Sequence, residues 1–346
     1  MRRHLNTLYV TTEGAWLNKD GENVVVSFDG AERGRLPIHT IGSILGFGRV
    51  LISPPLLGAC AEAGISVDYF SEHGRSLARV EGPVSGNVLL RRTQYRWADD
   101  AAKRDAIIRS IVAGKVLNQR TVVARALRDH GEGMPEPNRA ALAAAADRLG
   151  AIVRRLEKPA DGDGLRGFEG EAGLVYFSVF DHLVLGEKPL FAFTGRSRRP
   201  PLDATNALLS FVYSLLTADV RGALEGVGLD PAVGYLHVDR PGRPSLALDL
   251  VEEFRPFFAD RLVLSLINRR QLTAKDFRCL DNGATLLSED GRKAVLVAYQ
   301  ERKRDEIQHP FLDEKVTVGL LWHVQAQLLA RHLRGDLDAY PPFVWR

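Results

Sequence analysis

Cysteine is scarce in this chain of 346 residues, and its scarcity restricts the classes of protein to which the chain can belong. Cys60 and Cys279 are the only two cysteines, and they lack the paired spacing of a zinc or redox motif. Two isolated cysteines fit free thiols in a reducing cytosol. We therefore expect no disulfide framework.

Long apolar runs are also missing. No window of the sequence approaches the length of a membrane span. Met1 to His4 leads into a strand-like run rather than into the apolar core of a signal peptide. We predict a soluble, cytoplasmic protein with no membrane partner.

Several common catalytic motifs do not occur. The chain contains no Walker-type loop, no paired-histidine zinc motif and no Gly-x-Ser-x-Gly elbow, and Gly46-Phe47-Gly48 lacks the third glycine and the helix of a dinucleotide site. Nothing in the sequence therefore points to P-loop hydrolysis, to dinucleotide chemistry or to Ser/His/Asp catalysis.

An excess of charge of one sign is nearly absent. The 46 lysines and arginines exceed the 43 aspartates and glutamates by only three charges. This balance is compatible with a nucleic-acid partner but does not require one. The 45% of hydrophobic residues suffice for a core, and the length suggests two domains, although one large domain is also possible.

The beginning of the chain has the patterns of β-strands. Short apolar runs bounded by turn signals, such as the Asp20-Gly21 pair, predict strands and hairpins as far as Ile65 to Phe70. Between them, Pro54-Pro55 marks the start of a short helix that ends at Gly64.

From Asn87 onward, apolar residues recur at helical spacing and strand signals are weak. Gly82-Pro83 punctuates the chain just before this change, so we place one unit at 1–85 and a second at 86–346. The last residues, Tyr340 to Phe343, have the composition of an irregular tail.

Two isolated polar residues are candidates for chemistry. Glu169 lies between Gly167 and Gly170, just after a predicted loop at Lys158 to Gly167. By itself it is more simply an acid at the start of a helix, interacting with the helix dipole. His237 lies among apolar residues before the turn that starts at Pro241. A lone histidine of this kind is usually structural.

A pair of acids follows in a third segment. Asp249 and Glu252 are three residues apart, so they share a face of the helix that Ser245 is expected to cap. A solvated acidic face is the ordinary explanation of such a pair. The run from Leu246 to Val251 is too apolar for full exposure, however, and a cation would remove the repulsion between the two carboxylates.

Together, Glu169, His237 and Glu252 form a mixed oxygen and nitrogen donor set. Such a set suits Mn²⁺ or Mg²⁺ with open positions for water and phosphate oxygens. Phosphodiester chemistry uses a metal of this kind to neutralise the phosphate and to stabilise the leaving oxygen. The sequence alone does not show that the three side chains meet.

Several basic residues lie near these segments and are candidates for contacts with DNA phosphates. A solvated charged face is the simpler explanation of any single cluster. We also count Asn206 among the predicted DNA contacts. The full set is Arg91, Arg92, Arg196, Arg198, Arg199, Asn206, Arg302 and Arg304.

The sequence resembles the CRISPR-associated integrases, which are the larger subunit of the spacer-acquisition complex. The resemblance runs across most of the chain, and its early part is most similar to the type I-C version. The matching blocks are Leu5 to Val10, Ile44 to Gly48, Leu90 to Tyr95, Lys115 to Arg120, Glu169 to Ala172, Asn206 to Tyr213, Gly234 to His237 and Leu248 to Pro256.

The resemblance implies an α+β protein with a small N-terminal β-sandwich-like domain and a larger, all-α catalytic domain. It implies a homodimer built through the β domains, a small dimeric partner subunit and, in type I-C systems, an iron–sulfur nuclease that trims the DNA. The implied substrates are double-stranded DNAs, namely the prespacer and the CRISPR repeat.

The implied activity is the attack of a DNA 3′-hydroxyl on a phosphodiester at the edge of a repeat, with a metal-dependent endonuclease activity in the absence of the partner. Glu169, His237 and Glu252 match the family's ligands for Mg²⁺ or Mn²⁺, and Asp249 matches an acid with a supporting or second-metal role. The imidazole must be unprotonated to bind metal, so we expect activity to fall in mild acid.

Two alternatives stay open. One is a catalytically idle, architectural DNA-binding subunit with the same fold, against which the intact Glu169, His237 and Glu252 set argues. The other is an unrelated helical metalloenzyme that acts on a small phosphate ester, against which the resemblance argues.

Overall fold

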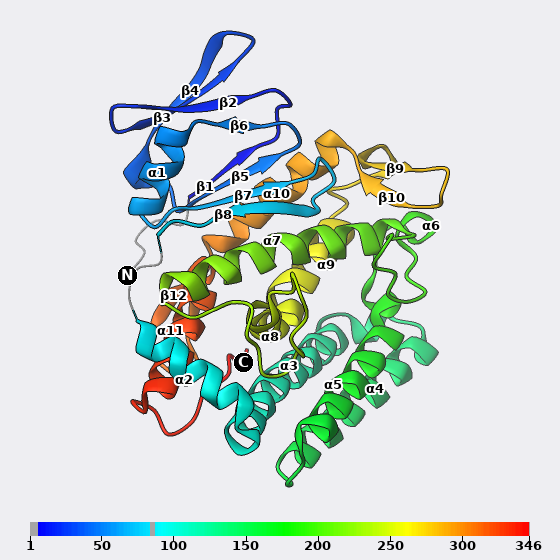
Figure 1. Cartoon of the computed structure of the whole chain (residues 1–346). Coiled ribbons are helices and arrows are strands. Elements are labelled where there is room, and N and C mark those ends of the chain that lie inside the picture. The colour runs from blue at the N-terminus through cyan, green and yellow to red at the C-terminus, as the bar shows by residue number, and fades with distance from the viewer. Residues whose placement is uncertain (1–5, 84–86, 346) are drawn as a thin grey trace.

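A computed structural model describes residues 6–83 and 87–345. A small strand-rich unit lies beside a larger, mainly helical body (Figure 1). The predicted boundary between 85 and 86 falls at residues 84–86, outside the described residues. The two predicted unit ranges therefore stay predictions.

The N-terminal strands form two four-stranded sheets, ordered β4-β3-β2-β6 and β1-β5-β7-β8. Their bounds are β1 Thr7–Val10, β2 Trp16–Asp20, β3 Asn23–Phe28, β4 Ala31–Pro37, β5 Ser43–Phe47, β6 Leu51–Ile52, β7 Ser66–Phe70 and β8 Ser76–Val80. The predicted hairpin is confirmed, because β2 and β3 pair antiparallel as far as Asp20 and Asn23. Gly21 adopts a φ of +57° in the turn, a conformation that favours glycine.

One apolar core joins these two sheets to helix α1 (Pro54–Glu62), which begins at the predicted proline pair. Alternation along the strands divides the side chains of β5 between two cores. Ile44 is buried in the N-terminal core, whereas Leu45 and Phe47 belong to the core of the helical body. The β1-β5-β7-β8 sheet is therefore apolar on both faces.

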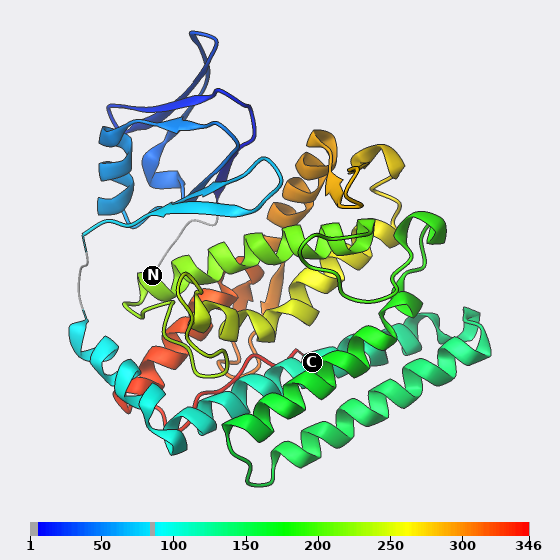
Figure 2. The ribbon, with the colours of Figure 1, turned by 45° about the vertical axis from the view of Figure 1, so that its right-hand side comes forward.

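The remainder of the chain is mainly helical, as expected. Its principal helices are α2 Val88–Asp99, α3 Ala101–His130, α4 Glu136–Leu156, α5 Gly162–Ser178, α6 Lys188–Phe191, α7 Ala204–Gly226, α8 Ser245–Phe254, α9 Arg261–Asn268, α10 Glu289–Lys303 and α11 Leu321–Arg334. A π-helical turn, Arg255–Asp260, joins α8 to α9. Figure 2 shows α3, α4 and α5 side by side, in agreement with their mutual contacts.

The expectation of an all-α catalytic region is wrong in one respect. Two small antiparallel hairpins occur there, β9 (Phe277–Cys279) with β10 (Thr285–Leu287), and β11 (Glu306–Gln308) with β12 (Lys315–Thr317). Strands of three residues are too short to show a two-residue period. The Asn282-Gly283 pair was a usable hairpin signal for the first of them, and Gly283 has a φ of +78°.

Helix α7 contradicts the expectation about apolar windows. By length and composition, Ala204–Gly226 is a helix that could cross a membrane. The core helix of a globular protein passes the same test, and α7 is such a helix. Leu208, Val212 and Leu216 are fully buried in the main core. Figure 1 shows α7 running between the β1-β5-β7-β8 sheet and the rest of the helical body.

Charged groups as well as apolar ones fix the β unit to α7. Arg79 of β8 is buried and pairs both with Asp68 of β7 and with Glu225 of α7. Lys303 of α10 donates to Asp219 of α7 over 3.0 Å and to the Thr7 hydroxyl of β1 over 3.3 Å. One salt bridge, from Arg79 to Glu225, and one hydrogen bond, from Lys303 to Thr7, thus connect the two units.

Candidate functional site

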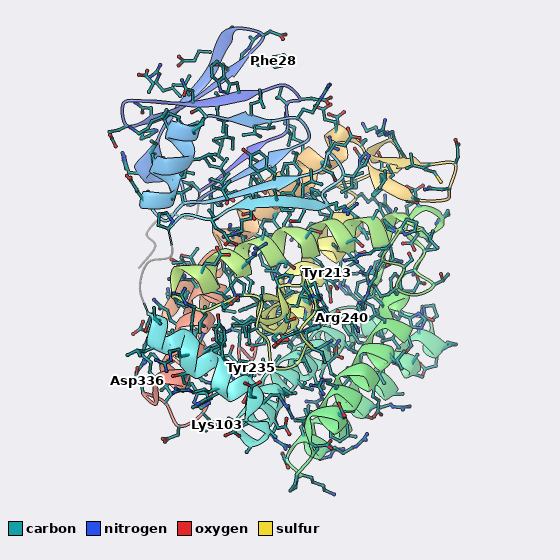
Figure 3. All side chains as sticks on the ribbon, in the orientation of Figure 1. Phe28, Lys103, Tyr213, Tyr235, Arg240 and Asp336 are labelled. Atoms are coloured by element: carbon teal, nitrogen blue, oxygen red, sulfur yellow. The ribbon has the colours of Figure 1, made fainter. Side chains whose placement is uncertain are left out.

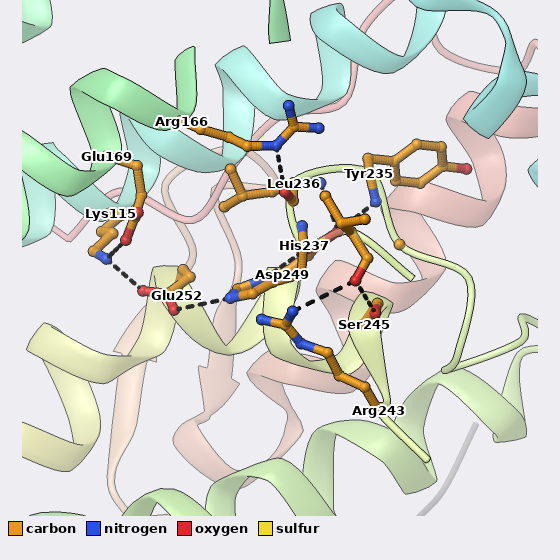
Figure 4. Close-up of polar contacts among 12 residues, drawn as sticks. Lys115, Arg166, Glu169, Tyr235, Leu236, His237, Arg243, Ser245, Asp249 and Glu252 are labelled. Carbon is orange, nitrogen blue, oxygen red and sulfur yellow. Dashed lines mark hydrogen bonds and ion pairs between the residues drawn. The ribbon is translucent and has the colours of Figure 1, made fainter. Parts of the chain in front are cut away.

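Side chains from three separate parts of the helical body meet at one place (Figure 4). Glu169 comes from α5, His237 from the loop before α8, and Glu252 from α8. The ammonium group of Lys115, on α3, forms ion pairs with both Glu169 and Glu252. Nε2 of His237 lies 4.0 Å from Oε1 of Glu252. The structure thus brings together the three residues singled out in the sequence.

The sequence suggested that Glu169 lies at the start of a helix, and the structure shows that it does not. Helix α5 begins at Gly162, inside the predicted loop, because the side chain of Asp161 caps it by accepting a 2.8 Å hydrogen bond from the amide of Gly164. Glu169 therefore lies two turns into the helix, away from the orphan amides at its N-terminus. Its carboxylate is held by Lys115 instead of by a helix dipole.

Asp249 fixes the orientation of His237. Oδ1 of Asp249 lies 2.7 Å from Nδ1 of His237 and also accepts the amide of His237 at 2.9 Å. Since a carboxylate only accepts, Nδ1 carries a proton, and in the neutral imidazole the lone pair is then on Nε2, which is the nitrogen toward Glu252. Figure 4 shows this pair beside Glu252.

Both oxygens of Asp249 are fully used. Oδ2 accepts the amides of Tyr235 and Leu236 at 2.7 and 3.0 Å, and the side chain is completely buried. This geometry suits the supporting role of Asp249 rather than a second-metal role. A β-carbon on Gly234 would lie 2.9 Å from Oδ2 and 2.8 Å from Ser245, so the close approach of the loop to α8 requires glycine.

The prediction that Ser245 caps α8 is wrong. It is the first residue of the helix, the N-cap position belongs to Pro244, and no side chain caps this end. The Ser245 hydroxyl instead donates to the carbonyl of Val238 over 3.4 Å, back to the loop that carries His237.

Glu252 is almost completely buried and ionised. Burial opposes ionisation, but the positive charges of Arg255 and Lys115 outweigh it and hold the pKa of Glu252 well below its usual range. Arg255 hydrogen-bonds Oε1. Oε2 is buried, and its only partner is the Lys115 ammonium, 2.7 Å away in an ion pair.

The donor set suits a hard divalent cation, although the side chains are not yet gathered around one point. Within 6–83 and 87–345, no three His, Cys, Asp or Glu side chains are close enough to hold a metal ion. Two carboxylates nevertheless face one ammonium, an imidazole nitrogen lies 4.0 Å from one of them, and Oε2 of Glu252 has no partner besides that ammonium. A buried carboxylate oxygen partnered only by an ammonium fits a site built for a cation.

Three basic residues of the site were missed in the sequence: Lys115, Arg166 and Arg255. The guanidinium of Arg166, on α5, donates to the carbonyl of Leu236 over 2.9 Å and so ties the histidine loop to the helix that carries Glu169 (Figure 4). The sequence did contain a signal for Lys115, since a lysine within the apolar stripe of α3, between Val112 and Val116, indicates a buried charge that needs a partner.

The predicted DNA contacts divide by exposure. Arg92, Arg198, Arg199 and Arg304 are exposed, and Arg91 is half-buried. Arg302 is largely covered and donates to the carbonyl of Phe257 over 3.2 Å. The exposed arginines can therefore reach a phosphate, whereas the covered side chain of Arg302 is less accessible to DNA.

Asn206 is poorly placed to contact DNA. Its side chain is completely buried, with its oxygen accepting from Arg196 and its nitrogen donating to the carbonyl of Gly195 over 2.7 Å and to Asp203 over 2.6 Å. The sequence block that contains Asn206 did not reveal that these partners saturate the amide. Asn206 therefore shapes the loop that carries Arg196.

The ring of Tyr213 connects Arg196 to the site, because Arg255 contacts the same ring. Its guanidinium carbon is 5.4 Å from the centre of the Tyr213 ring, and that of Arg255 is 4.8 Å from the same ring. Figure 3 labels Tyr213 in the middle of the molecule, near α7. Two guanidinium groups thus contact one half-buried tyrosine, and one of them, that of Arg255, also holds Glu252.

The sequence and the fold both match known proteins. A family model described as CRISPR associated protein Cas1 matches residues 8–301. The chain is 58% identical over 347 residues to a CRISPR-associated endonuclease Cas1 from Rhodospirillum rubrum, and 55% identical over 346 residues to one from Chlorobaculum tepidum. Each of these matches covers 100% of both proteins.

Two further matches concern a solved structure and a fusion protein. A Cas1 protein from Thermotoga maritima has a TM-score of 0.80 at 25% identity, covering 95% of this chain and 97% of that one. An exonuclease Cas4/endonuclease Cas1 fusion from Rhodospirillum rubrum is 35% identical over 339 residues, which are 97% of this chain and 57% of the fusion.

Proposed function

The chain belongs to the CRISPR-associated Cas1 endonuclease family, and from this premise we propose that it is a metal-dependent DNA integrase and endonuclease that inserts new spacers into a CRISPR array. The observation that carries the proposal is the convergence of three separate elements: Lys115 pairs with both Glu169 and Glu252, and Nε2 of His237 lies 4.0 Å from Glu252.

Glu169, Glu252 and Nε2 of His237 would hold Mg²⁺ or Mn²⁺, which would neutralise the phosphate and stabilise the leaving oxygen. Asp249 keeps the proton of His237 on Nδ1, so that the lone pair of Nε2 faces the ligands. Arg255 keeps Glu252 ionised and immobile. Arg166 holds the histidine loop against α5.

The proposed reaction is a transesterification at a repeat boundary. The 3′-hydroxyl oxygen of the prespacer attacks the phosphorus, the bond from that phosphorus to the 3′ oxygen of the repeat strand breaks, and a new phosphodiester forms. One proton leaves the attacking hydroxyl and one joins the departing oxygen, so no external oxidant or energy source is needed. With water as the nucleophile, the same site would act as an endonuclease.

The partners are also part of the proposal. We place the protein in the cytoplasm, as a homodimer built through the β units, with a small dimeric partner subunit and double-stranded prespacer and repeat DNA. The relative in which a Cas4 exonuclease is fused to Cas1 supports an iron–sulfur trimming nuclease as a further partner. The early sequence blocks, such as Ile44 to Gly48, support assignment to type I-C.

One observation favours the architectural alternative. Lys115 and Arg255 together already balance the charges of Glu169 and Glu252, so the site is electrostatically satisfied without a metal. A subunit that only binds DNA could keep this arrangement permanently.

The deciding experiment is a joining assay with the small partner subunit. A duplex with free 3′-hydroxyl ends is incubated with a supercoiled plasmid that carries the repeat, in Mn²⁺, in EDTA, and with His237→Ala in place of the native chain. We expect joining only by the native chain in Mn²⁺. Joining that survives both EDTA and the substitution would refute the site, and tight DNA binding without joining would support the architectural subunit.

A further inference from the structure

Lys115 occupies the place that a cation would take between two carboxylates. Its side chain is 7% exposed, and its ammonium is in ion-pair contact with Glu169 and, at 2.7 Å, with Oε2 of Glu252. Two carboxylates against one buried ammonium mark a charged lysine in the interior of the site.

The two carboxylates differ in what else they contact. Oε1 of Glu252 is held by Arg255, whereas Oε2 has only the ammonium as a partner. Glu169 retains 29% exposure, so this side of the site is open toward solvent. A lysine has a flexible four-carbon stem and a compact charge, so the ammonium can withdraw toward that opening. Arg255 would still hold Glu252 after the ammonium had left.

Resting on the function proposed above, we propose that Lys115 is an internal counter-ion that holds Glu169 and Glu252 in register before metal binding and must be displaced by the divalent cation. The ammonium and the metal compete for the same two carboxylates. Lys115 thereby weakens metal binding and prevents the repulsion that two unpaired carboxylates would otherwise exert in a buried place. It is a positioning residue of the site, not a ligand.

A second buried lysine shows what an ordinary structural ion pair looks like here. Lys303 is 4% exposed, pairs with the single carboxylate of Asp219, and donates to the hydroxyl of Thr7. It lies between the β unit and α7 and contacts neither Glu169 nor Glu252. Replacing Lys303 therefore removes a buried ammonium while the proposed ligands keep their contacts.

The test measures Mn²⁺ binding, without DNA, by the full chain and its variants. Bound Mn²⁺ is counted by the loss of the electron paramagnetic resonance signal of the free ion, and thermal midpoints are recorded with and without Mn²⁺. The variants are Lys115→Met and Lys115→Gln, with Lys303→Met as the matched control and His237→Ala as the control for ligand loss. Lys115→Gln keeps a hydrogen-bond donor, so its Mn²⁺ binding is compared with that of the native chain if Lys115→Met does not fold.

We expect both Lys115 variants to bind Mn²⁺ at least about tenfold more tightly than the native chain, because the competing charge is gone. Without metal they should melt at a lower temperature than the native chain, and Mn²⁺ should raise their midpoints more. Lys303→Met should melt lower but bind Mn²⁺ as the native chain does. His237→Ala should weaken binding.

Two results would overturn the proposal, and they are distinguishable. Binding by the Lys115 variants that is equal to or weaker than native binding would refute the counter-ion role, while His237-dependent binding by the native chain would leave the metal-dependent function intact. Absence of any His237-dependent Mn²⁺ binding by the native chain would refute the proposed function and the counter-ion together.

Discussion

The backbone amide of Phe343 donates a 2.7 Å hydrogen bond to Oε2 of Glu253, the residue that follows Glu252 on α8. The hydroxyl of Tyr340 donates to the other oxygen of Glu253 over 2.8 Å. Asn118, one turn along α3 from Lys115, donates to the carbonyls of Glu253 and Phe343. The C-terminal segment is thus bound to the two helices that carry Glu252 and Lys115.

We predict that Glu253→Ala destabilises the protein by about 3 kcal/mol, because the buried donors of Tyr340, Phe343 and Gln325 lose their acceptor. Urea unfolding measures this change. Joining activity should fall as well, since α8 loses its anchor. Glu157→Ala, at an exposed site, is the control and should change stability by less than about 0.5 kcal/mol. Equal effects of the two substitutions would contradict the anchoring role.

We predict that Asp249→Asn lowers Mn²⁺ affinity and joining by about 10- to 100-fold, because an amide cannot accept four hydrogen bonds and fix the proton on Nδ1 of His237. Titration with Mn²⁺ and the joining assay measure the two effects. Asp239→Asn, exposed in the same loop, is the matched control. Native affinity in the Asp249→Asn protein would show that His237 is oriented by other contacts.

The buried Asp68 between the β strands should make stability depend on pH. Burial raises its pKa to about 6, against the lowering influence of Arg79 and Arg221. Because the folded pKa lies above the unfolded one, the contribution of Asp68 is fully present below about pH 4 and is lost as the pH rises through about 6.

Native stability relative to that of Asp68→Asn should therefore fall by about 2 kcal/mol between about pH 4.5 and about pH 7.5. Urea unfolding of both proteins across this range measures the difference. Asp99→Asn, at an exposed position, should follow the native curve. A difference between native and Asp68→Asn that stays constant with pH would exclude this titration.

For DNA binding, we predict that the double substitution of Arg198 and Arg199 by alanine weakens affinity for duplex DNA, because both side chains are exposed. It should also reduce the slope of log K against log salt by about 1 to 2. Binding titrations at several salt concentrations measure both quantities. Arg33→Ala, an exposed arginine of β4, is the control. An unchanged slope would mean that the loop contacts no phosphate.

Local sequence signals were sufficient for several elements. The Asp20-Gly21 turn, the helix after Pro54-Pro55 and the helical spacing of apolar residues after Asn87 all matched the structure, because each depends on neighbouring residues. The capping of α5 by Asp161 was also local but was overlooked, and it moved Glu169 from a helix start to a helix interior.

Other features depended on contacts between distant segments. The apolar length of α7 was missed in the sequence, and only the fold shows that a sheet on one side and helices on the other bury this helix. Asn206 had the polarity of a DNA contact, but residues of the preceding loop saturate its amide. The C-terminal segment looked irregular, yet the amide of Phe343 and the hydroxyl of Tyr340 bind Glu253 across 90 and 87 positions of sequence.

By itself, the sequence determined the chemical kinds of side chain at the site and the spacing of Asp249 and Glu252 on one helix face, because these depend only on residue identity and helical periodicity. Tertiary structure alone decided that Glu169, His237 and Glu252 meet, that Asp249 serves His237, and that Lys115 lies between the two glutamates. These relationships arise from the packing of α3, α5 and α8, whose side chains are far apart in sequence and become neighbours only when their apolar faces are buried together.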